Sequence, residues 1–531
     1  MDTILDLNDI QGNILKTYAR KEYIFARYIF FSIRDGAKGR KFVSDITEYV
    51  TNAAPWGHED NPKPDATTNI AFTYHGLKKL ELPEESLHSF PEDFSMGMRE
   101  RSSILGDTGI SAPEHWDPVW NNGDKKVDIW VSVNGLNETA IEKRYELIMK
   151  LCEDSEGGVI LLTGHRGDDG RDDLHYQDAS ALFKDGKATA KEHFGYDDGI
   201  SNPYFKGCQS NPAFVLGGGK PTTGDPATLG GWKPLETGEF ILGYRDEAQE
   251  YPEAAMPRLL SFNGTFMVYR KLHENVGSFN RYIKEKGQEM GEDGEELVAA
   301  KFSGRWRNGA PITTFPTYKE ACQYVEDRAE AKEKFDKADG MISKNLAKLK
   351  YYKLLSKLVG FDYNKDLEGG RCPVGAHMRR TNPRGALQFG QKGAFDTPGA
   401  LVNRRRLLRR GLPYGTSEEG TDKDDGNHGI IFMTVGANIT RQFEFVQQQW
   451  INYGNDFKLA NDKDPILGNH NTDEQGKSDG KMVFEAEKDS SNTPHFCSNI
   501  PRFVEMRGGG YFFLPSMTAL RLIGAGIIDP T

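Results

Sequence analysis

The chain has 531 residues, with 67 Lys and Arg against 78 Asp and Glu, and its formal net charge at pH 7 is −11. This charge argues against a general nucleic-acid binder, because such proteins gain affinity by neutralising phosphates. The length allows two or three domains and a core large enough to enclose a cofactor.

The cysteines and the N-terminus bear on the compartment of the protein. The cysteines are odd in number and form no CxxC pair, so the sequence predicts neither a disulfide framework nor a zinc site. Residues 1–7 lack the basic and apolar parts of a signal peptide, and no stretch approaches the ~18 apolar residues of a membrane span. We therefore expect a cytoplasmic or otherwise soluble protein with no membrane partner, and secretion of a processed form stays open.

The N-terminal part of the chain has the pattern of a ferredoxin-like unit. Aromatic and β-branched runs predict four strands, and apolar residues at helical spacing predict two helices. Their order, β-α-β-β-α-β, is that of an antiparallel sheet with helices on one face. The predicted elements are strand 26–33, helix 42–50, strand 69–73, strand 127–133, helix 141–152 and strand 158–163.

The remainder of the chain repeats much of this pattern, with long insertions. We therefore predict an α+β fold of two ferredoxin-like halves with antiparallel sheets, divided into an N-terminal domain of residues 1–205 and a C-terminal domain of residues 206–531. The highly charged segment 327–357 is expected to form one long solvent-facing helix in an insertion. The predicted elements of the second half are strand 240–244, strand 264–270, helix 273–286, strand 429–435, helix 439–452 and strand 510–514.

A short polar segment, residues 193–203, is the first candidate for a functional site. It places two carboxylates between Gly195 and Gly199 and ends in Asn-Pro. Glycine at both ends permits positive φ and a close approach of the backbone to a bulky group, and the residue before a proline is driven out of the helical region. Asp-Asp-Gly is also ordinary turn chemistry, so this segment is either a surface turn or the wall of a ligand site.

Two further segments carry histidine and arginine in unusual surroundings. Small and apolar residues lead into His377 and arginines follow it, which suits an axial metal ligand beside a large planar cofactor with anionic side groups. A single histidine is nevertheless more often a core or surface residue. Arg409 follows two leucines and precedes a Gly- and Pro-rich turn, and an arginine in apolar surroundings needs a partner. We expect it to lie in a shaped loop.

These three segments together resemble the dye-decolorizing peroxidase family. The Gly-x-x-Asp-Gly pattern at 195–199 is similar to the signature of that family, 376–384 to its proximal haem-ligand segment, and 406–415 to its distal-arginine segment. The beginning of the chain at 7–15 and its last strand region at 509–515 are similar as well. The resemblance therefore covers nearly the whole chain.

The resemblance implies one haem b between two ferredoxin-like halves, held mainly by the C-terminal half. His377 would be the fifth iron ligand, Asp198 the distal acid–base group and Arg409 the distal arginine. The other residues that it assigns to the pocket are Arg384 and His193 at the haem propionates and Ile430 and Phe432 in the apolar distal wall.

The implied function is a peroxidase that reduces hydrogen peroxide and oxidises dyes, phenolic and other aromatic one-electron donors. An aspartate base, titrating near ~3.9, favours acidic pH. Because a bulky dye cannot enter a small distal pocket, Tyr414 and Trp450 are predicted to relay electrons from the surface, although an aromatic residue at a helix end usually serves packing.

Two alternatives belong to other classes. A non-catalytic haem-binding or haem-handling protein would keep His377 and the propionate arginines without needing Asp198 and Arg409 together. A non-haem protein that binds partners through its acidic loops would need none of them. The oligomeric state and the physiological reductant stay open.

Overall fold

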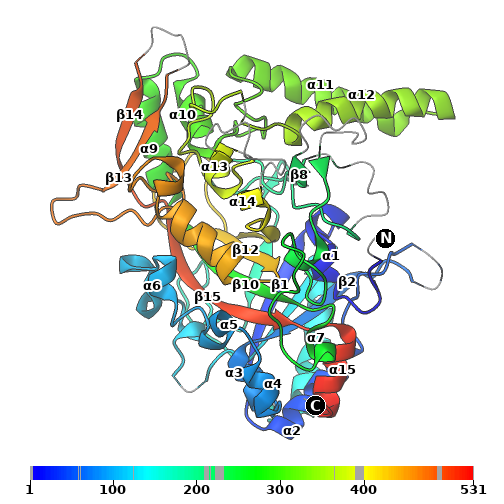
Figure 1. Ribbon diagram of the computed structural model, residues 1–531. Coiled ribbons are helices and arrows are strands. Elements are labelled where there is room, and N and C mark those ends of the chain that lie inside the picture. The colour runs from blue at the N-terminus through cyan, green and yellow to red at the C-terminus, as the bar shows by residue number, and fades with distance from the viewer. Residues whose placement is uncertain are drawn as a thin grey trace.

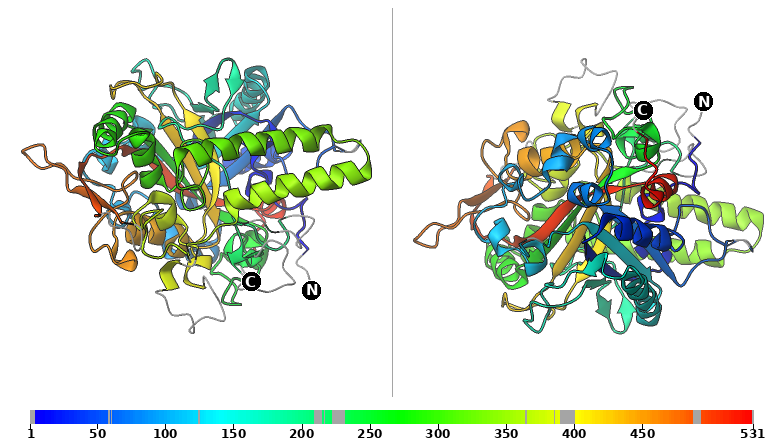
Figure 2. Two further views of the ribbon diagram at one scale, coloured as in Figure 1. Left: turned by 90° about the horizontal axis from the view of Figure 1, so that it is seen from above. Right: turned by 90° about the horizontal axis from the view of Figure 1, so that it is seen from below.

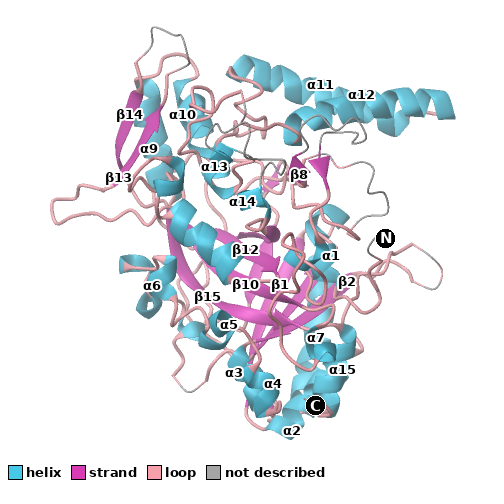
Figure 3. Cartoon of the chain, in the orientation of Figure 1, coloured by secondary structure: helices cyan, strands magenta, loops and turns pink. Residues whose placement is uncertain are grey.

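The fold is that of a computed structural model, which describes residues 4–57, 59, 61–123, 125–208, 215, 217–221, 232–363, 365–384, 386–388, 400–486 and 493–529. It is an α+β structure of antiparallel strands (Figures 1 and 3). Within these ranges no helix is both long enough and apolar enough to cross a membrane.

The N-terminal half is a ferredoxin-like unit. The strands lie in the order β4-β1-β3-β2 and every pairing among them is antiparallel. Asp35 accepts a hydrogen bond from the Lys38 N–H and so caps the first helix, and Asn137 caps the second in the same way. The elements are β1 (Phe25–Ile33), α2 (Gly36–Thr47), β2 (Ala66–Phe72), β3 (Ile129–Gly135), α7 (Glu138–Asp154) and β4 (Val159–Leu161).

The C-terminal half repeats the same unit with the same strand order, β15-β10-β12-β11. A single pairing, Phe72 with Phe513, joins the two half-sheets. The prediction of two ferredoxin-like halves is confirmed, whereas the boundary between residues 205 and 206 stays a prediction. The elements are β10 (Thr265–Glu274), α9 (Val276–Gln288), β11 (Leu408–Tyr414), β12 (Gly429–Gly436), the π-helical turns Thr440–Glu444 and Val446–Ile451, and β15 (Val504–Leu514).

Three predictions about elements are wrong. Residues 240–244 form no strand, because Gly243 takes a φ of +88° directly after the 3₁₀ turn Thr237–Glu239. Residues 408–414 form the edge strand β11 and not a loop, since an edge strand tolerates the Pro413 that lacks an N–H. Segment 327–357 belongs to two antiparallel helices, α11 (Tyr318–Lys337) and α12 (Met341–Val359), and not to one. Gly340, at a φ of +75°, allows the chain to reverse direction between them.

The remaining elements are short. Those of the N-terminal 200 residues are α1 (Gly12–Leu15), α3 (Tyr74–Lys79), α4 (Glu84–His88), α5 (Glu92–Met96), α6 (Ser102–Leu105), β5 (Gln177–Ser180), β6 (Phe183–Lys184) and β7 (Lys187–Ala188). Those that follow are β8 (Lys220–Pro221), β9 (Trp232–Lys233), α8 (Arg258–Ser261), α10 (Gly294–Ser303), α13 (His377–Thr381), α14 (Ala400–Asn403), β13 (Gly480–Phe484), β14 (His495–Ile500) and α15 (Met517–Ala525).

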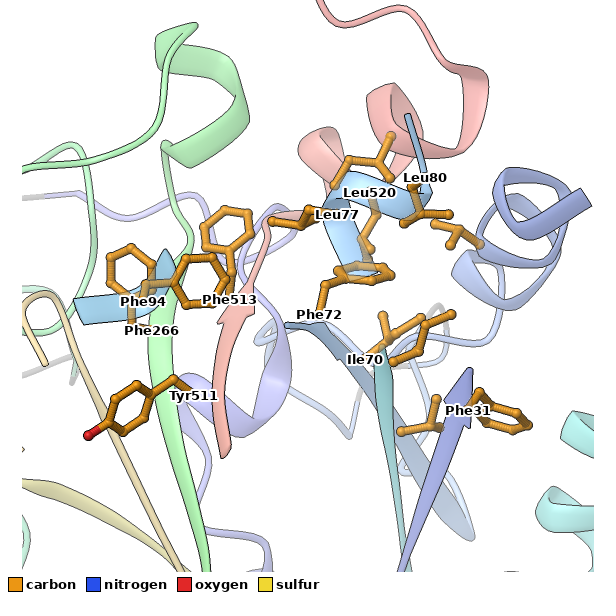
Figure 4. Packing of buried hydrophobic residues seen from close by; sticks show 14 of the residues in the cluster. Phe31, Ile70, Phe72, Leu77, Leu80, Phe94, Phe266, Tyr511, Phe513 and Leu520 are labelled. Atoms are coloured by element: carbon orange, nitrogen blue, oxygen red, sulfur yellow. The ribbon is translucent and has the colours of Figure 1, made fainter. Parts of the chain in front are cut away.

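The strands are buried on both faces, so the sheet lies between two hydrophobic cores. Because side chains alternate along a strand, Phe31 of β1 joins the core under the helices while Phe30 joins a second core between the half-sheets. Figure 4 shows the first core, where Phe72 and Ile70 of β2 meet Leu77 and Leu520. Along β12, Ile431 and Met433 enter the core between the half-sheets. The alternate side chains of β12 are therefore left for another face, and that face carries the site.

Candidate active site

A cavity of about 300 Å³ lies against the C-terminal half-sheet. Its apolar wall comes from alternate residues of the strands, including Leu272 of β10, Ile430 and Phe432 of β12 and Met506 of β15. Asp197, Asp198 and residues 200–203, in the loop that the sequence singled out, also line it, and so does His377 at the beginning of α13. The structure therefore brings the three sequence segments to one place.

The loop of residues 193–203 has the special backbone that its glycines predict. Gly195 and Gly199 take φ angles of +91° and +66°, which L-residues rarely adopt. A Cβ on Gly199 would meet no described protein atom within 4 Å, so the glycine there answers to the backbone angle and not to crowding by the protein.

The two carboxylates of this loop have different partners. Asp197 forms an ion pair with Lys191 at 2.8 Å, while Asp198 accepts a hydrogen bond from Arg409 Nη1 at 2.9 Å. The Asp198 side chain keeps 49% of its surface accessible, and it lies among the cavity-lining residues. Burial alone would raise the pKa of Asp198, but the Arg409 charge and the Gly199 N–H hold that pKa below its ordinary value. Asp198 is therefore an ionised group that still has room for a reactant.

Arg409 is tied through its backbone to the loop of residues 193–203, and a second contact holds that loop from the N-terminal part of the chain. Its backbone N–H donates to Asn202 Oδ1 at 3.0 Å, which ties the edge strand β11 to the loop. Arg20 donates to the Gly199 carbonyl from the other end of the chain. Both contacts join segments some 200 residues apart in sequence, so no local pattern could have indicated them.

His377 has an acidic partner from a distant part of the chain, Asp464. The ring Nδ1 contacts Asp464 Oδ2 at 2.9 Å, and the Asp464 side chain is fully buried. The Ile466 and Leu467 N–H groups each donate to Asp464 Oδ1 at 2.9 Å. Burial alone would raise the pKa of Asp464, but the contact with His377, aided by the nearby Arg380, lowers it. The ring is thus held at Nδ1, and Nε2 has no hydrogen-bond partner among the described residues.

Three buried arginines give the cavity an excess of positive charge. Arg305, Arg384 and Arg406 line it, and in the described part of the chain their guanidinium groups donate to main-chain carbonyls and form no ion pair with a carboxylate. Burial lowers the pKa of Arg305 to about 9 and that of Arg406 to about 9, and the charge of Arg384 contributes to both shifts. The Arg384 Nε is buried without any partner.

This donor set fits a haem. An apolar cavity with one oriented imidazole suits a planar iron macrocycle, and arginines without carboxylate partners suit its two carboxylate side groups. The buried Nε of Arg384, which has no partner among the described residues, leaves one donor of a cavity-lining guanidinium available to such a carboxylate.

The remaining predicted residues are placed less uniformly. Ile430 and Phe432 line the cavity. His193 does not; its ring contacts Ser417 Oγ at 2.8 Å and the Tyr414 carbonyl at 3.0 Å, and burial lowers its pKa to about 4. A place for His193 at a propionate stays a prediction.

Tyr414 and Trp450 are not surface aromatics, and that part of the prediction is wrong. Each is only 1% exposed. Tyr414 lies on β11, whose core-facing side chains alternate with Arg409, and Trp450 donates from Nε1 to Asp456 Oδ2 at 3.0 Å within a small apolar cluster. Neither ring is available to a bulky molecule in solvent.

A pair of buried glutamates lies beside Asp198. Glu192 receives the Phe194 and Tyr196 N–H groups at 2.9 and 2.7 Å, and its side chain meets that of Glu274. Two carboxyl groups in contact need a shared proton, since neither ionised group can donate. Burial, with the neighbouring carboxylates, raises the pKa of Glu192 to about 7 and that of Glu274 well above its ordinary value.

Comparisons with known proteins agree with this architecture. The family model described as the DyP dimeric alpha+beta barrel domain matches residues 9–166. A solved ancestral D-type dye decolorizing peroxidase has a TM-score of 0.70 and 27% identity, with 98% of this chain and 99% of that chain covered. The chain is therefore similar to dye-decolorizing peroxidases over nearly its whole length, and residues 9–166 match the domain model of that family.

Further relatives are similar to this chain over most of their own length. A dye-decolorizing peroxidase of Mycetinis scorodonius is 26% identical over 98% of this chain and 88% of its own. A multifunctional dye peroxidase of Amycolatopsis is 28% identical over 97% of this chain and 95% of its own. The family model ends before residue 193, so the roles of the cavity residues in this chain rest on their geometry.

Proposed function

We propose that this chain is a haem b peroxidase that reduces hydrogen peroxide and oxidises dyes, phenolic and other aromatic one-electron donors. The observation that carries the proposal is the Asp198–Arg409 ion pair in a cavity that also receives the oriented imidazole of His377. The similarity to dye-decolorizing peroxidases over nearly the whole chain and the names of the relatives support it.

In this proposal His377 holds the haem iron through Nε2, because Nδ1 is engaged by Asp464. Arg384, Arg305 and Arg406 bind the propionates, and Ile430 with Phe432 keeps the distal side apolar. Bound haem would supply the redox-active iron that accepts and returns the electrons of the reaction.

The distal pair handles the proton of hydrogen peroxide. The Asp198 carboxylate accepts a proton from one peroxide oxygen and returns it to the other, which then leaves as water. The Arg409 guanidinium, already fixed 2.9 Å from Asp198, stabilises negative charge on the departing oxygen. Because its pKa is lowered, Asp198 stays a base at acidic pH, where a histidine would already be protonated. We therefore propose that activity favours acidic pH.

Large donors cannot touch the rings of Tyr414 and Trp450, because both are buried. Either ring would therefore act only as an internal relay for electrons. Loss of dye turnover in Tyr414→Phe or Trp450→Phe, with turnover of a small phenol unchanged, supports a relay. Equal kinetics for both donors contradicts it.

The test is a spectrum followed by an assay. Purified protein supplied with haem b should develop a Soret band that saturates at one haem per chain, and the complex should oxidise a phenol only when hydrogen peroxide is added. Absence of a Soret band contradicts the haem site altogether. A saturating Soret band without peroxide turnover favours the alternative, a non-catalytic haem-binding or haem-handling protein.

A further inference from the structure

The helical hairpin of α11 and α12 reaches the cavity only at its base, where the Leu358 and Val359 carbonyls at the end of α12 accept hydrogen bonds from Arg305 and Arg384. Figures 1 and 2 show the two helices running antiparallel and extending past the body of the molecule. Helix α12 has 19 residues, which corresponds to a rod of about 28 Å. The part of α12 from Met341 to Lys350 does not line the cavity, and nothing in the proposed peroxidase reaction uses it.

Helix α12 has two apolar faces, and the described protein covers only one. On the covered face, Tyr351 stacks on Phe335 of α11 with ring centroids 6.1 Å apart, and Leu358 and Val359 enter the core under the hairpin. On the opposite face, Ile342, Leu346 and Leu349 recur at the i, i+4, i+7 spacing of a single stripe. A soluble helix ordinarily turns only one stripe toward apolar neighbours.

The second stripe is exposed over its whole length. The exposed fractions are 75% for Ile342, 65% for Leu346 and 68% for Leu349, and Met341 at the start of the helix is 79% exposed. Single exposed apolar residues need no explanation, but a continuous row on one helix marks a surface that meets a partner.

The charges beside the stripe indicate what kind of partner. Helix α12 contains five lysines and no carboxylate, in a chain whose net charge is −11. In the part of the chain that the structure describes, none of the five forms an ion pair with a carboxylate. They are Lys344, Lys348, Lys350, Lys353 and Lys357. Lys353 continues the row of the stripe, and Lys350 and Lys357 flank it.

We propose that the exposed face of α12 docks on a lipid surface that carries anionic headgroups. The apolar stripe would enter the boundary between headgroups and acyl chains, with the helix axis parallel to the surface, and the lysine ammonium groups would reach the phosphates. Helix α12 would lie on the surface and not cross it, consistent with the absence of a spanning helix among the described residues.

A second copy of the chain fits this face less well. Pairing α12 with α12 of another copy would bring five lysines against five lysines with no carboxylate between them. Pairing it with α11 of another copy would find no exposed large apolar side chain there, since the described residues of α11 expose mainly charged side chains. Three lysines of α11 are moreover already paired within that helix, as Lys332–Asp336, Lys334–Glu330 and Lys337–Glu333.

The test is vesicle co-sedimentation of the full chain. The wild type should sediment with vesicles of equal parts phosphatidylglycerol and phosphatidylcholine, and binding should weaken as salt rises, because charge attraction to the surface is screened. The triple variant Ile342→Ser, Leu346→Ser, Leu349→Ser should lose this binding. The double variant Lys350→Glu, Lys353→Glu should lower the bound fraction roughly tenfold or more, given the contribution of each lysine near an anionic surface.

The matched control replaces exposed apolar residues elsewhere. Leu259 and Phe496 are 59% and 70% exposed but lie far from α12 in sequence, and Leu259→Ser with Phe496→Ser should leave vesicle binding unchanged. Circular dichroism of every variant should match the wild type, which shows that the hairpin still folds.

Three results would overturn the proposal. These are no sedimentation of the wild type with anionic vesicles, equal binding of the triple variant, and a wild-type dimer in light scattering that the triple variant converts to a monomer. The last result would assign the face to a second copy. Peroxidase turnover in solution should be the same for all variants, so the outcome is independent of the proposed reaction.

Discussion

Two carboxylates, Asp464 beside His377 and Asp198 beside Arg409, each contact a basic side chain that lines the cavity. They differ in how many of their oxygens already have partners. Asp464 is fully buried, and its two oxygens receive two backbone N–H groups and the His377 ring. Asp198 keeps about half of its surface accessible, at 49%, and meets Arg409 through one oxygen.

In the proposed function, this difference assigns the two carboxylates different roles: Asp464 marks the end of the cavity that holds the haem, and Asp198 marks the end where peroxide reacts. A carboxylate with every oxygen engaged cannot take a new partner without losing hydrogen bonds, so Asp464 can only orient His377. A carboxylate that faces a cavity and is kept ionised by a neighbouring arginine can accept a proton and release it again. The variants below remove one feature at a time from one end of the cavity.

The largest effect is expected at the reacting end. Asp198→Asn should lower the rate of the reaction with hydrogen peroxide by about 10²–10⁴-fold, because the amide cannot accept the proton. The Soret band of the haem complex should stay, since Asp198 is not part of the proposed haem-holding set. Stopped-flow absorbance after mixing with peroxide measures the rate.

The neighbouring acid supplies the matched control for that variant. Asp197 is one residue away but pairs with Lys191, so Asp197→Asn should change the peroxide rate by much less than Asp198→Asn. Equal losses in both variants would mean that the loop, and not the Asp198 carboxylate, matters. An unchanged rate in Asp198→Asn would leave the haem-handling alternative standing.

At the holding end we expect a smaller effect, on affinity. Asp464→Asn should weaken haem binding by about 10–100-fold, the usual consequence of losing the carboxylate that orients a ligating histidine. Haem titration followed by absorbance measures it. Asp462→Asn is the control, because Asp462 pairs with Lys481 at 3.1 Å and does not contact His377. A wild-type affinity in Asp464→Asn would contradict the orienting role.

Local sequence patterns predicted most of the fold. Aromatic and β-branched runs located β1, β3 and β12, and helical periodicity located α7 and α9, because strands buried on both faces need apolar runs and helices need an apolar stripe. β11 escaped because arginines, Gly411 and Pro413 are typical of a turn, yet an edge strand accepts them. The break before α12 had only Gly340 as its signal.

The candidate site was predicted in the same uneven way. Composition alone indicated an unusual backbone in the loop with Gly195 and Gly199. It also indicated unusual charge in the segments of His377 and Arg409. Asp464 has no such signal, since it lies in an acidic loop 87 residues after its partner. Only the packing of the chain brings that carboxylate to the ring.

The dependence on Arg409 should appear as a shift along the pH axis. The lowered pKa of Asp198 means that its base form persists until pH falls below the ordinary aspartate value, and activity should be retained down to that point. Arg409→Met removes the charge that lowers this pKa, so the acid limb of the peroxide rate should move to higher pH. Arg409→Lys, which keeps the charge, should move it less. A limb that stays in place in Arg409→Met would show that Asp198 does not titrate in that limb.

The smallest effect concerns the glutamate pair behind Asp198, and its readout is stability. The pKa of Glu192 is raised from 4.5 to about 7, so between these values the folded protein binds more protons than the unfolded chain. Stability should therefore fall as pH rises from ~4.5 to ~7, which is the sign expected for an acid whose ionisation folding opposes. The pKa of Glu274 is also raised, so Glu274→Gln removes a second carboxyl whose ionisation folding opposes and keeps a hydrogen-bonding group, and it should reduce this fall by about 1 kcal/mol.

Calorimetric Tm values at the two ends of that pH range measure the fall. Glu285→Gln is the control, because Glu285 is 72% exposed on α9 and should leave the pH dependence of Tm as it is. A steeper fall in Glu274→Gln than in the wild type would mean that the Glu274 carboxyl stabilises its neighbour by donating a proton more than it opposes it by charge. An unchanged fall would mean that Glu274 has no part in the pH dependence of stability. Asp198 would then be the one carboxylate beside the cavity for which the surroundings are shown to set the ionisation.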